Sequence, residues 1–196
     1  MSMISIIAHN PVSRHLCERY FMKTIIRIIL FALLVSISIF AQQTSFQDSL
    51  LDRMTGNWIL KGTIAGQEVT HDIEVSWILE HQYLQISEIS REKDADGTAA
   101  YEALVLIGWD SELSKYACLW LDVTGGGGLS AKAITGYAER SGDEIPFLFK
   151  TNEESVWHTT FVYNRNTETW QWNMDGEDNG KLKPFARVKL TKNKVD

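Results

Sequence analysis

The chain has 196 residues, of which 44% are hydrophobic and 22% charged, so it is long enough for one folded domain and too hydrophobic to be disordered. Its net charge is −6, and the part after residue 41, with 15 basic and 24 acidic side chains, carries −9. A domain this acidic repels phosphate backbones and anionic lipid head groups, so no nucleic-acid partner is predicted.

Residues 22–41 are predicted to be a signal peptide. The segment starts with Met22-Lys-Thr, continues as a long apolar run and ends at Ala41, a small residue where cleavage is expected. Cleavage there leaves residues 42–196 as a secreted or periplasmic domain with no stable membrane anchor. The alternative is an uncleaved anchor, because the apolar run is only slightly short for crossing a bilayer. Residues 1–21 precede the methionine of the signal and are interpreted as an upstream extension.

One helix is predicted, at residues 46–55, where apolar side chains recur at helical spacing. Everything after Gly56 is predicted to form strands, because short alternating segments are separated by glycine, asparagine and aspartate residues that favour turns. The predicted strands are 57–64, 69–79, 82–90, 100–109, 115–122, 129–138, 145–150, 155–163, 168–174 and 184–191.

About ten strands with no helices between them indicate an all-β fold, a single up-and-down antiparallel barrel. Closing such a meander into a barrel removes the exposed edge strands that would otherwise pair with other chains. A two-sheet sandwich is the alternative fold. Only Cys118 lies after the predicted signal peptide, so no internal disulfide is expected.

Alternation along the strands predicts which side chains face the interior. In strand 69–79, for example, His71, Ile73, Val75 and Trp77 alternate with acidic and hydroxyl residues. The interior is therefore expected to be aromatic and suited to an apolar ligand. The competing interpretation is that the same side chains fill the barrel and leave no cavity. The residues predicted to line a ligand cavity are His71, Trp77, Tyr116, Trp120, Thr159, Phe161 and Trp172.

The segment Gly56-Asn-Trp58, after a short helix and at the start of the first strand, resembles the Gly-x-Trp signature of the calycin (lipocalin-like) superfamily. The resemblance implies a barrel closed at one end by a basic residue of the last strand that packs across the tryptophan. Arg187 is the residue assigned to this role, and a guanidinium over an indole ring is a favourable cation–π contact.

A longer pattern extends this resemblance to about residues 46–191. It runs from the Gly-x-Trp segment through Val75-Ser-Trp77 and Ile107-Gly-Trp-Asp110 to Tyr116 and Trp120. That order is similar to the bacterial domain-of-unknown-function 1579 family of the calycin group. The family supplies no activity to carry over, and its distant relatives include haem-binding nitrobindins and fatty-acid-binding proteins.

Two other motifs are better explained by structure than by ligand binding. The glycine run 125–128 lacks the following helix and the Lys-Ser/Thr pair of a phosphate loop, so a hairpin is predicted there. The acidic segment 175–180 resembles the start of a calcium loop, but its twelfth position is Ala186 rather than glutamate. An acidic hairpin tip is predicted instead.

No metal site or cofactor is expected, because His71, His81 and His158 do not have metal-ligand spacing. Haem is the alternative, with His158 as the only candidate axial ligand, although its neighbour Trp157 is expected to face inward. No nucleophile motif occurs, and Tyr101 with Glu102 and Trp120 with Asp122 are the only candidate acid–base groups.

The sequence thus predicts an exported, non-enzymatic barrel that binds a small apolar or amphipathic molecule. Two alternatives remain open at this point. One is an enzyme with acid–base groups at the mouth of the barrel, and the other is an envelope protein that acts through its outer surface and holds no internal ligand. The oligomeric state is not predicted.

Overall fold

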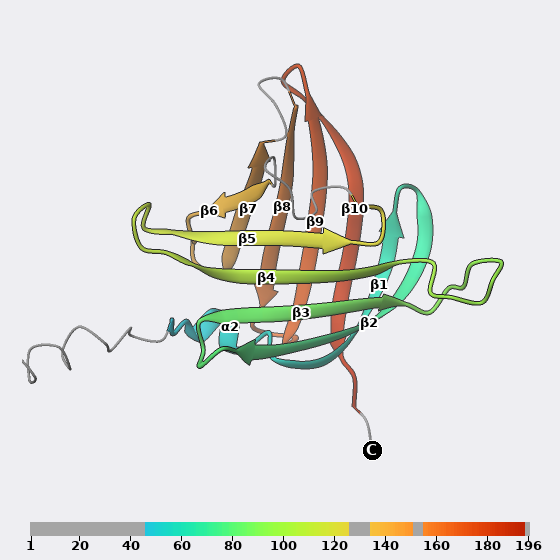
Figure 1. The fold of residues 1–196 in the computed structure, drawn as a ribbon, viewed down its shortest axis with the longest axis horizontal. Helices are drawn as coiled ribbons and strands as arrows, with labels where there is room; N and C mark the ends of the chain where they lie inside the picture. Colours follow the sequence, from blue (N-terminus) through green and yellow to red (C-terminus); the bar gives the residue numbers. More distant parts are fainter. Residues whose placement is uncertain (1–45, 126–133, 151–154, 195–196) are drawn as a thin grey trace, which may run out of the picture. The chain divides into compact units, whose positions relative to one another are not determined.

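The computed structural model describes residues 46–125, 134–150 and 155–194, which form a closed barrel of ten antiparallel strands (Figure 1). Each strand pairs with its neighbours in sequence, and β1 pairs with β10 to close the barrel. The all-β up-and-down barrel is therefore confirmed, and the sandwich alternative is wrong. The strands are β1 (Gly56–Ile64), β2 (Gln67–Ile78), β3 (Tyr83–Ser90), β4 (Glu102–Asp110), β5 (Lys115–Asp122), β6 (Thr135–Ala138), β7 (Glu144–Lys150), β8 (Ser155–Asn164), β9 (Thr169–Asp178) and β10 (Lys181–Lys192).

Several sequence predictions lie outside the described residues. These are the upstream extension 1–21, the signal peptide 22–41, the glycine run at 126–128 and the first part of the strand predicted at 129–138. Within the part of the chain that the structure describes, no helix has the length and hydropathy needed to cross a membrane.

The two ends of the barrel differ in what covers them. We call one the helix end, because it carries α2 (Ser49–Asp52) together with the turns 79–82, 111–114, 139–143 and 165–168. The other, the far end, carries the β1–β2 turn, the β3–β4 loop and the β9–β10 hairpin. Figure 1 shows α2 beside the β2–β3 turn and the β9–β10 hairpin projecting away from it.

The helix end is packed with apolar side chains. Leu51 and Met54 from the α2 segment are fully buried, as is Trp58 at the start of β1. Phe46 lies among three rings, with its centroid 5.8 Å from Trp77, 5.9 Å from Trp109 and 5.7 Å from Tyr116. The N-terminal segment therefore plugs this end of the barrel.

The helix is shorter than the predicted range 46–55. Asp48 caps it, because its Oδ1 accepts hydrogen bonds from the amides of Leu50 (2.8 Å) and Leu51 (2.9 Å), and only Ser49–Asp52 follow in helical conformation. Gly56 then takes a φ of +106° and starts β1. The apolar spacing marked the buried face correctly, but the cap and this glycine limit the helix to one turn.

A lysine, and not Arg187, closes the helix end over Trp58. The Nζ of Lys192 lies 3.9 Å from the centroid of the Trp58 ring and donates to the Thr55 carbonyl at 2.6 Å. The register explains the correction, because Trp58 pairs with Lys192 whereas Arg187 pairs with Thr63. Arg187 instead forms an ion pair with Asp175 at 2.6 Å. The predicted closing contact is present, but a different cation makes it.

The β9–β10 hairpin is longer than predicted and has a tighter turn. The segment expected to form an acidic hairpin tip, 175–180, is mostly strand, since β9 continues to Asp178. Asn179 and Gly180 have φ values of 50° and 72°, which suit a two-residue hairpin turn with the twist of the flanking strands. The ladder between β1 and β10 ends at Ala186, so residues 181–184 pair with β9 alone and project past the barrel wall. Phe185 lies at a bulge between the two ladders, where its carbonyl accepts a hydrogen bond from the Ala65 amide at 2.8 Å.

Asp48 joins α2 to the barrel wall through side-chain contacts with Tyr116 and Arg140. Tyr116 donates its hydroxyl to Asp48 Oδ2, and Nη1 of Arg140 lies 3.3 Å from the same carboxylate. Burial opposes ionisation of Asp48, but the hydrogen bonds from Tyr116 and from α2, together with the charge of Arg140, hold its pKa below the ordinary value. Burial and the bond to Asp48 raise the pKa of Tyr116 to about 12.

Asp48→Asn should lower the free energy of unfolding by about 2 kcal/mol at pH 7, because a charged hydrogen-bond acceptor is lost. A carboxylate with a lowered folded-state pKa stabilises the fold above its unfolded pKa, and this contribution disappears as the pH falls through the folded pKa. The difference from the unsubstituted protein should therefore shrink below pH 3.8. Urea unfolding at pH 7 and pH 2.5 measures it, with the exposed Glu112→Gln as control. A difference that does not depend on pH would contradict this role.

Candidate functional site

A buried histidine and a buried glutamate contact each other inside the far half of the barrel. His71 lies on β2 and Glu88 on β3, and their side chains are 3% and 2% exposed. His71 Nδ1 and Glu88 Oε1 lie 2.5 Å apart and share a hydrogen bond. Burying two ionisable groups among apolar side chains is unfavourable unless they satisfy each other. Their presence marks this region as the polar centre of an otherwise apolar interior.

Tyr101 and Trp120 extend this polar centre towards β4 and β5. The Tyr101 ring stacks on His71 with 5.8 Å between centroids and 24° between planes. The Trp120 Nε1–H donates to the Tyr101 hydroxyl oxygen at 3.1 Å, and that hydroxyl donates to Asp122 Oδ2 at 3.4 Å. Burial, reinforced by the charge of Glu88, raises the pKa of Tyr101 far above its ordinary value. The hydroxyl therefore stays protonated at any physiological pH.

Glu92 connects the polar centre to the solvent. Its side chain is 44% exposed, and its Oε2 lies 4.0 Å from His71 Nε2. The carboxylate accepts hydrogen bonds from the Ser90 hydroxyl at 2.8 Å and the Thr70 amide at 3.0 Å. The Ser90 bond is the main reason that the pKa of Glu92 lies below its ordinary value. We call His71, Glu88, Ser90, Glu92, Tyr101, Trp120 and Asp122 the polar cluster.

An aromatic wall continues from the polar cluster across the barrel. Trp172 lies edge-on to Trp120, with 6.4 Å between centroids, and Phe161 lies 4.9 Å from Trp172. Trp170 and Trp172 are fully buried, yet neither indole Nε1–H has a hydrogen-bond partner among the described residues. Buried donors are nearly always paired, so these two are unusual.

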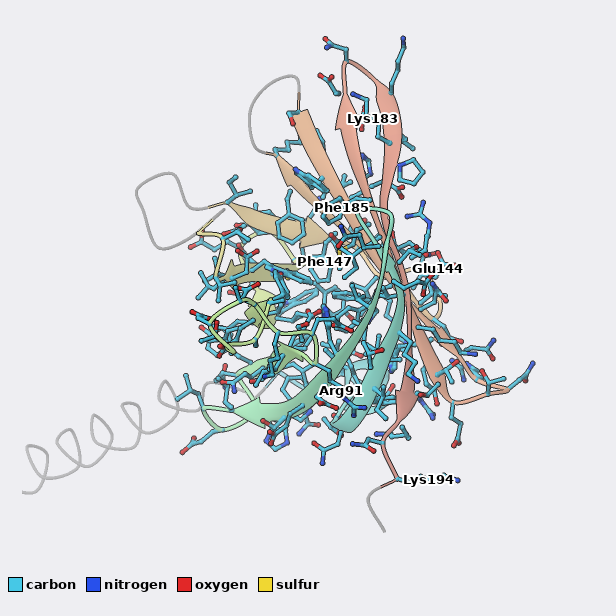
Figure 2. The ribbon with its side chains drawn as sticks, turned by 90° about the vertical axis from the view of Figure 1, so that its right-hand side faces the viewer. Arg91, Glu144, Phe147, Lys183, Phe185 and Lys194 are labelled. Carbon is cyan, nitrogen blue, oxygen red and sulfur yellow. The ribbon has the colours of Figure 1, made fainter. Side chains whose placement is uncertain are left out.

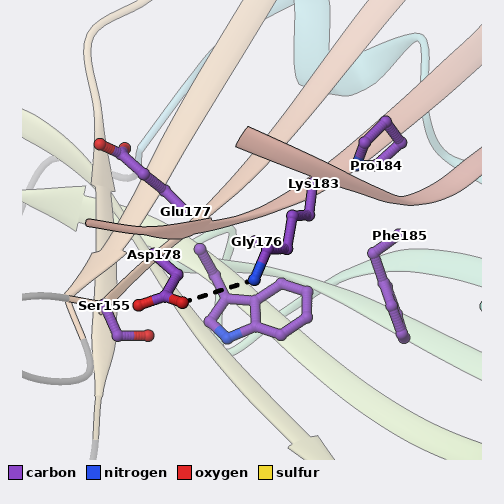
Figure 3. Close-up of a pocket in the computed structure, with 8 residues that line it drawn as sticks. Ser155, Gly176, Glu177, Asp178, Lys183, Pro184 and Phe185 are labelled. Atoms are coloured by element: carbon purple, nitrogen blue, oxygen red, sulfur yellow. Dashed lines mark hydrogen bonds and ion pairs between the residues drawn. The ribbon is translucent and has the colours of Figure 1, made fainter. Parts of the chain in front are cut away.

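A pocket of about 240 Å³ lies on the projecting part of β8, β9 and β10 (Figure 3). Trp157 and Phe185 meet edge to face there, with 5.1 Å between centroids. Lys183 and Asp178 form an ion pair at 3.4 Å beside them. The residues that line the pocket are Ser155, Trp157, Gly176, Glu177, Asp178, Lys183, Pro184 and Phe185.

The pocket shares a face with the barrel interior. Residues opposite each other on paired strands point to the same face, and Trp157 pairs with Gly176, which pairs with Lys183. Trp157 also shares alternation with Phe161, which is fully buried inside the barrel. Figure 2 shows Phe185 and Lys183 on the rising part of β10 and Phe147 among the interior side chains. The aromatic wall thus continues outward into a partly exposed lip.

Five of the seven residues predicted to line a cavity lie in one region. The ring contacts connect His71, through Tyr101, to Trp120, Trp172 and Phe161. Thr159 is buried next to them on β8, opposite Met174.

The other two lie at the helix end. Trp77 donates its indole N–H to Asp52 at 2.9 Å, and Tyr116 donates to Asp48. Both rings pack around Phe46 and belong to the plug. Alternation had identified their inward face but not their position along the barrel axis.

Sequence reasoning missed Glu88 and Ser90 as interior residues. The signal was present, since Leu84, Ile86, Glu88 and Ser90 alternate along β3 and all four are buried. No inward face was predicted for strand 82–90. Tyr101 and Asp122 had been named only as candidate acid–base groups, and the structure joins them to the cluster.

Trp157 and His158 occupy the opposite faces that the sequence predicted. Trp157 shares the inner face but is 36% exposed, because β8 extends beyond the closed part of the barrel. His158 points to the other face, where its Nε2 lies 2.6 Å from Glu177 Oε2. Among residues 46–125, 134–150 and 155–194, no group of three or more histidine, cysteine, aspartate or glutamate side chains is arranged to hold a metal ion.

Comparisons with known proteins give no relative from which a function can be transferred. No protein-family model matches the chain, and no curated protein matches it. The fold and the polar cluster are therefore the basis for assigning a function.

Proposed function

We propose that this chain is an exported, non-enzymatic barrel that binds a small hydrophobic or amphipathic molecule at its far end. We further propose that it belongs to the calycin superfamily, with the bacterial domain-of-unknown-function 1579 family as its relatives, and that cleavage of residues 22–41 delivers it to the periplasm or the cell exterior. The ten-strand up-and-down barrel is consistent with this assignment.

The observation that carries the proposal is the partly exposed pair Trp157 and Phe185. These rings lie on the inner face of the projecting strands, where they are 36% and 38% exposed. Covering apolar surface gains about 25 cal/mol per Å², so a ligand that removes about 200 Å² from water gains about 5 kcal/mol. An amphipathic molecule lying against the lip directs its other end towards the polar cluster.

The packing of the helix end supports binding from the far end alone. The interior next to α2 is occupied by fully buried Leu51, Met54 and Trp58. A ligand could use three interior polar groups: His71, Glu88 and the Trp172 N–H. All three lie towards the far end. Aromatic walls with a few fixed polar groups are the usual composition of a small-molecule site.

Native mass spectrometry of the protein purified from its own host tests this proposal. We expect a retained small molecule, and we expect Trp157→Ala to reduce its occupancy at least tenfold because the ring forms the lip. Trp109→Ala is the matched control, since Trp109 is another exposed tryptophan, 44% exposed, but lies at the helix end. The absence of any retained molecule, or equal losses in the two variants, would contradict the proposal.

An enzyme with acid–base groups at the mouth is the second candidate, and the His71–Glu88 contact is the observation that favours it. A carboxylate that accepts from Nδ1–H orients the imidazole and leaves Nε2 to exchange protons with a substrate. The same mass spectra distinguish the two functions. A bound molecule whose mass stays constant during incubation supports binding, and conversion to a product supports catalysis.

A further inference from the structure

The charges around the polar cluster are mostly negative. Glu88, Glu92 and Asp122 supply three carboxyl groups, and His71 is the one cluster member that can become a cation. The buried residues of the described ranges include no lysine or arginine. At the lip, Lys183 forms an ion pair with Asp178, and Lys150 and Lys181 are exposed to solvent. An anionic head group would find no buried cation here and would face carboxylates.

The aromatic side chains of the cluster favour a cation for a separate reason. Tyr101, Trp120 and Trp172 form a connected series of rings beside the carboxyl groups. The face of an aromatic ring carries negative potential, so a cation within about 6 Å of its centre is attracted to it. Several rings combined with carboxylates are the arrangement that binds ammonium groups.

The buried Trp172 N–H is an independent sign of a ligand. It has no acceptor among the described residues although Trp172 is fully buried. Leaving a buried donor unpaired destabilises a fold, so such a group usually has a partner. An acceptor oxygen would satisfy this donor, whereas an ammonium group, which only donates, would not.

We propose, on the basis of the binding function above, that the ligand is an organic amine bound in its protonated form, with a hydrogen-bond-accepting oxygen close to its ammonium group. The ammonium lies against the carboxylates and rings of the polar cluster. The oxygen accepts from Trp172, and the apolar part covers Trp157 and Phe185.

Four probes with the same eight-carbon chain test the charge of the head group: octyltrimethylammonium, octyldimethyl(2-hydroxyethyl)ammonium, octanol and octanoate. Binding is measured by quenching or shift of tryptophan fluorescence at low salt, with isothermal calorimetry as a second readout. We expect both ammonium probes to bind at least tenfold more tightly than octanol and octanoate. We expect the hydroxyethyl probe to bind about threefold more tightly than octyltrimethylammonium.

Three variants assign the preference to the cluster. Asp122→Asn should weaken binding of the ammonium probes at least fivefold and leave octanol within twofold. The exposed Glu112→Gln removes one negative charge at the helix end and should change neither. Trp172→Phe should remove the advantage of the hydroxyethyl probe.

The outcomes separate this inference from the binding function. If octanol or octanoate binds as tightly as the ammonium probes, the amine assignment is overturned while the binding function stands. If none of the four probes binds and no molecule is retained in native mass spectra, both are overturned. If Asp122→Asn and Glu112→Gln have equal effects, the preference arises from the overall negative charge and the site assignment is overturned.

Discussion

Glu88→Ala should lower the free energy of unfolding by about 3–5 kcal/mol, because it leaves His71 buried without its carboxylate partner. His71 is 3% exposed and Glu88 is 2% exposed, so water does not easily replace the missing partner of either side chain. His71→Ala should destabilise the protein to a similar extent, since the unpaired group is then the carboxylate. Chemical denaturation followed by tryptophan fluorescence measures both changes.

Replacing both partners distinguishes a structural role from a functional one. A double variant, His71→Phe with Glu88→Leu, removes both ionisable groups and keeps the volume filled, and such replacements are often neutral or stabilising. We expect this double variant to be at least as stable as the unsubstituted protein and to lose the small molecule retained in native mass spectra. A stable double variant that still holds the molecule would show that the pair does not contribute to binding.

Gly62→Ala should lower the free energy of unfolding by about 3–5 kcal/mol, through backbone strain and a direct clash. Gly62 has a φ of +150°, and a Cβ there would lie 2.2 Å from the Arg187 carbonyl oxygen on β10. The clash is with backbone, so no side chain can move aside to relieve it. The affected ladder is the β1–β10 pairing that closes the barrel.

Gly66→Ala is the matched control for this effect. Gly66 also has a positive φ, +79°, but a Cβ there would meet no atom within 4 Å. We expect a cost of about 1 kcal/mol, from the strained backbone conformation alone. Equal losses in the two variants, measured by urea unfolding, would show that the close approach of β1 to β10 is not what requires glycine at residue 62.

The division of the barrel into two halves explains why an aromatic interior need not be an open cavity. The plug formed by Phe46 and α2 occupies the helix end, so Trp77 and Tyr116 hold the N-terminal segment instead of lining a ligand site. The rings of the far half lie beside the buried His71–Glu88 contact and include Trp172, whose indole N–H is unpaired among the described residues. The packed plug and the buried polar groups therefore lie at different positions along the barrel axis.

The sequence alone determined the strand order and the face of most side chains. Turn residues separate the strands, and a period of two residues places His71, Trp172 and Phe161 on the interior face whatever the exact register. The same alternation is present along β3 and would also have placed Glu88 inside, although no face was predicted for that strand.

Only the tertiary structure decided the contacts between strands. Alternation specifies a face but not a position along the axis, so it did not separate Trp77 from Trp120. The register of the β1–β10 ladder pairs Trp58 with Lys192, so Lys192 makes the closing contact. Arg187 lies further along β10 and forms an ion pair with Asp175 instead. The contact between His71 and Glu88 likewise depends on the stagger of β2 against β3, which pairs Glu88 with Ile73 and brings its carboxylate diagonally to His71. Such stagger is fixed by turn lengths and packing across the whole barrel, and no local pattern in the sequence encodes it.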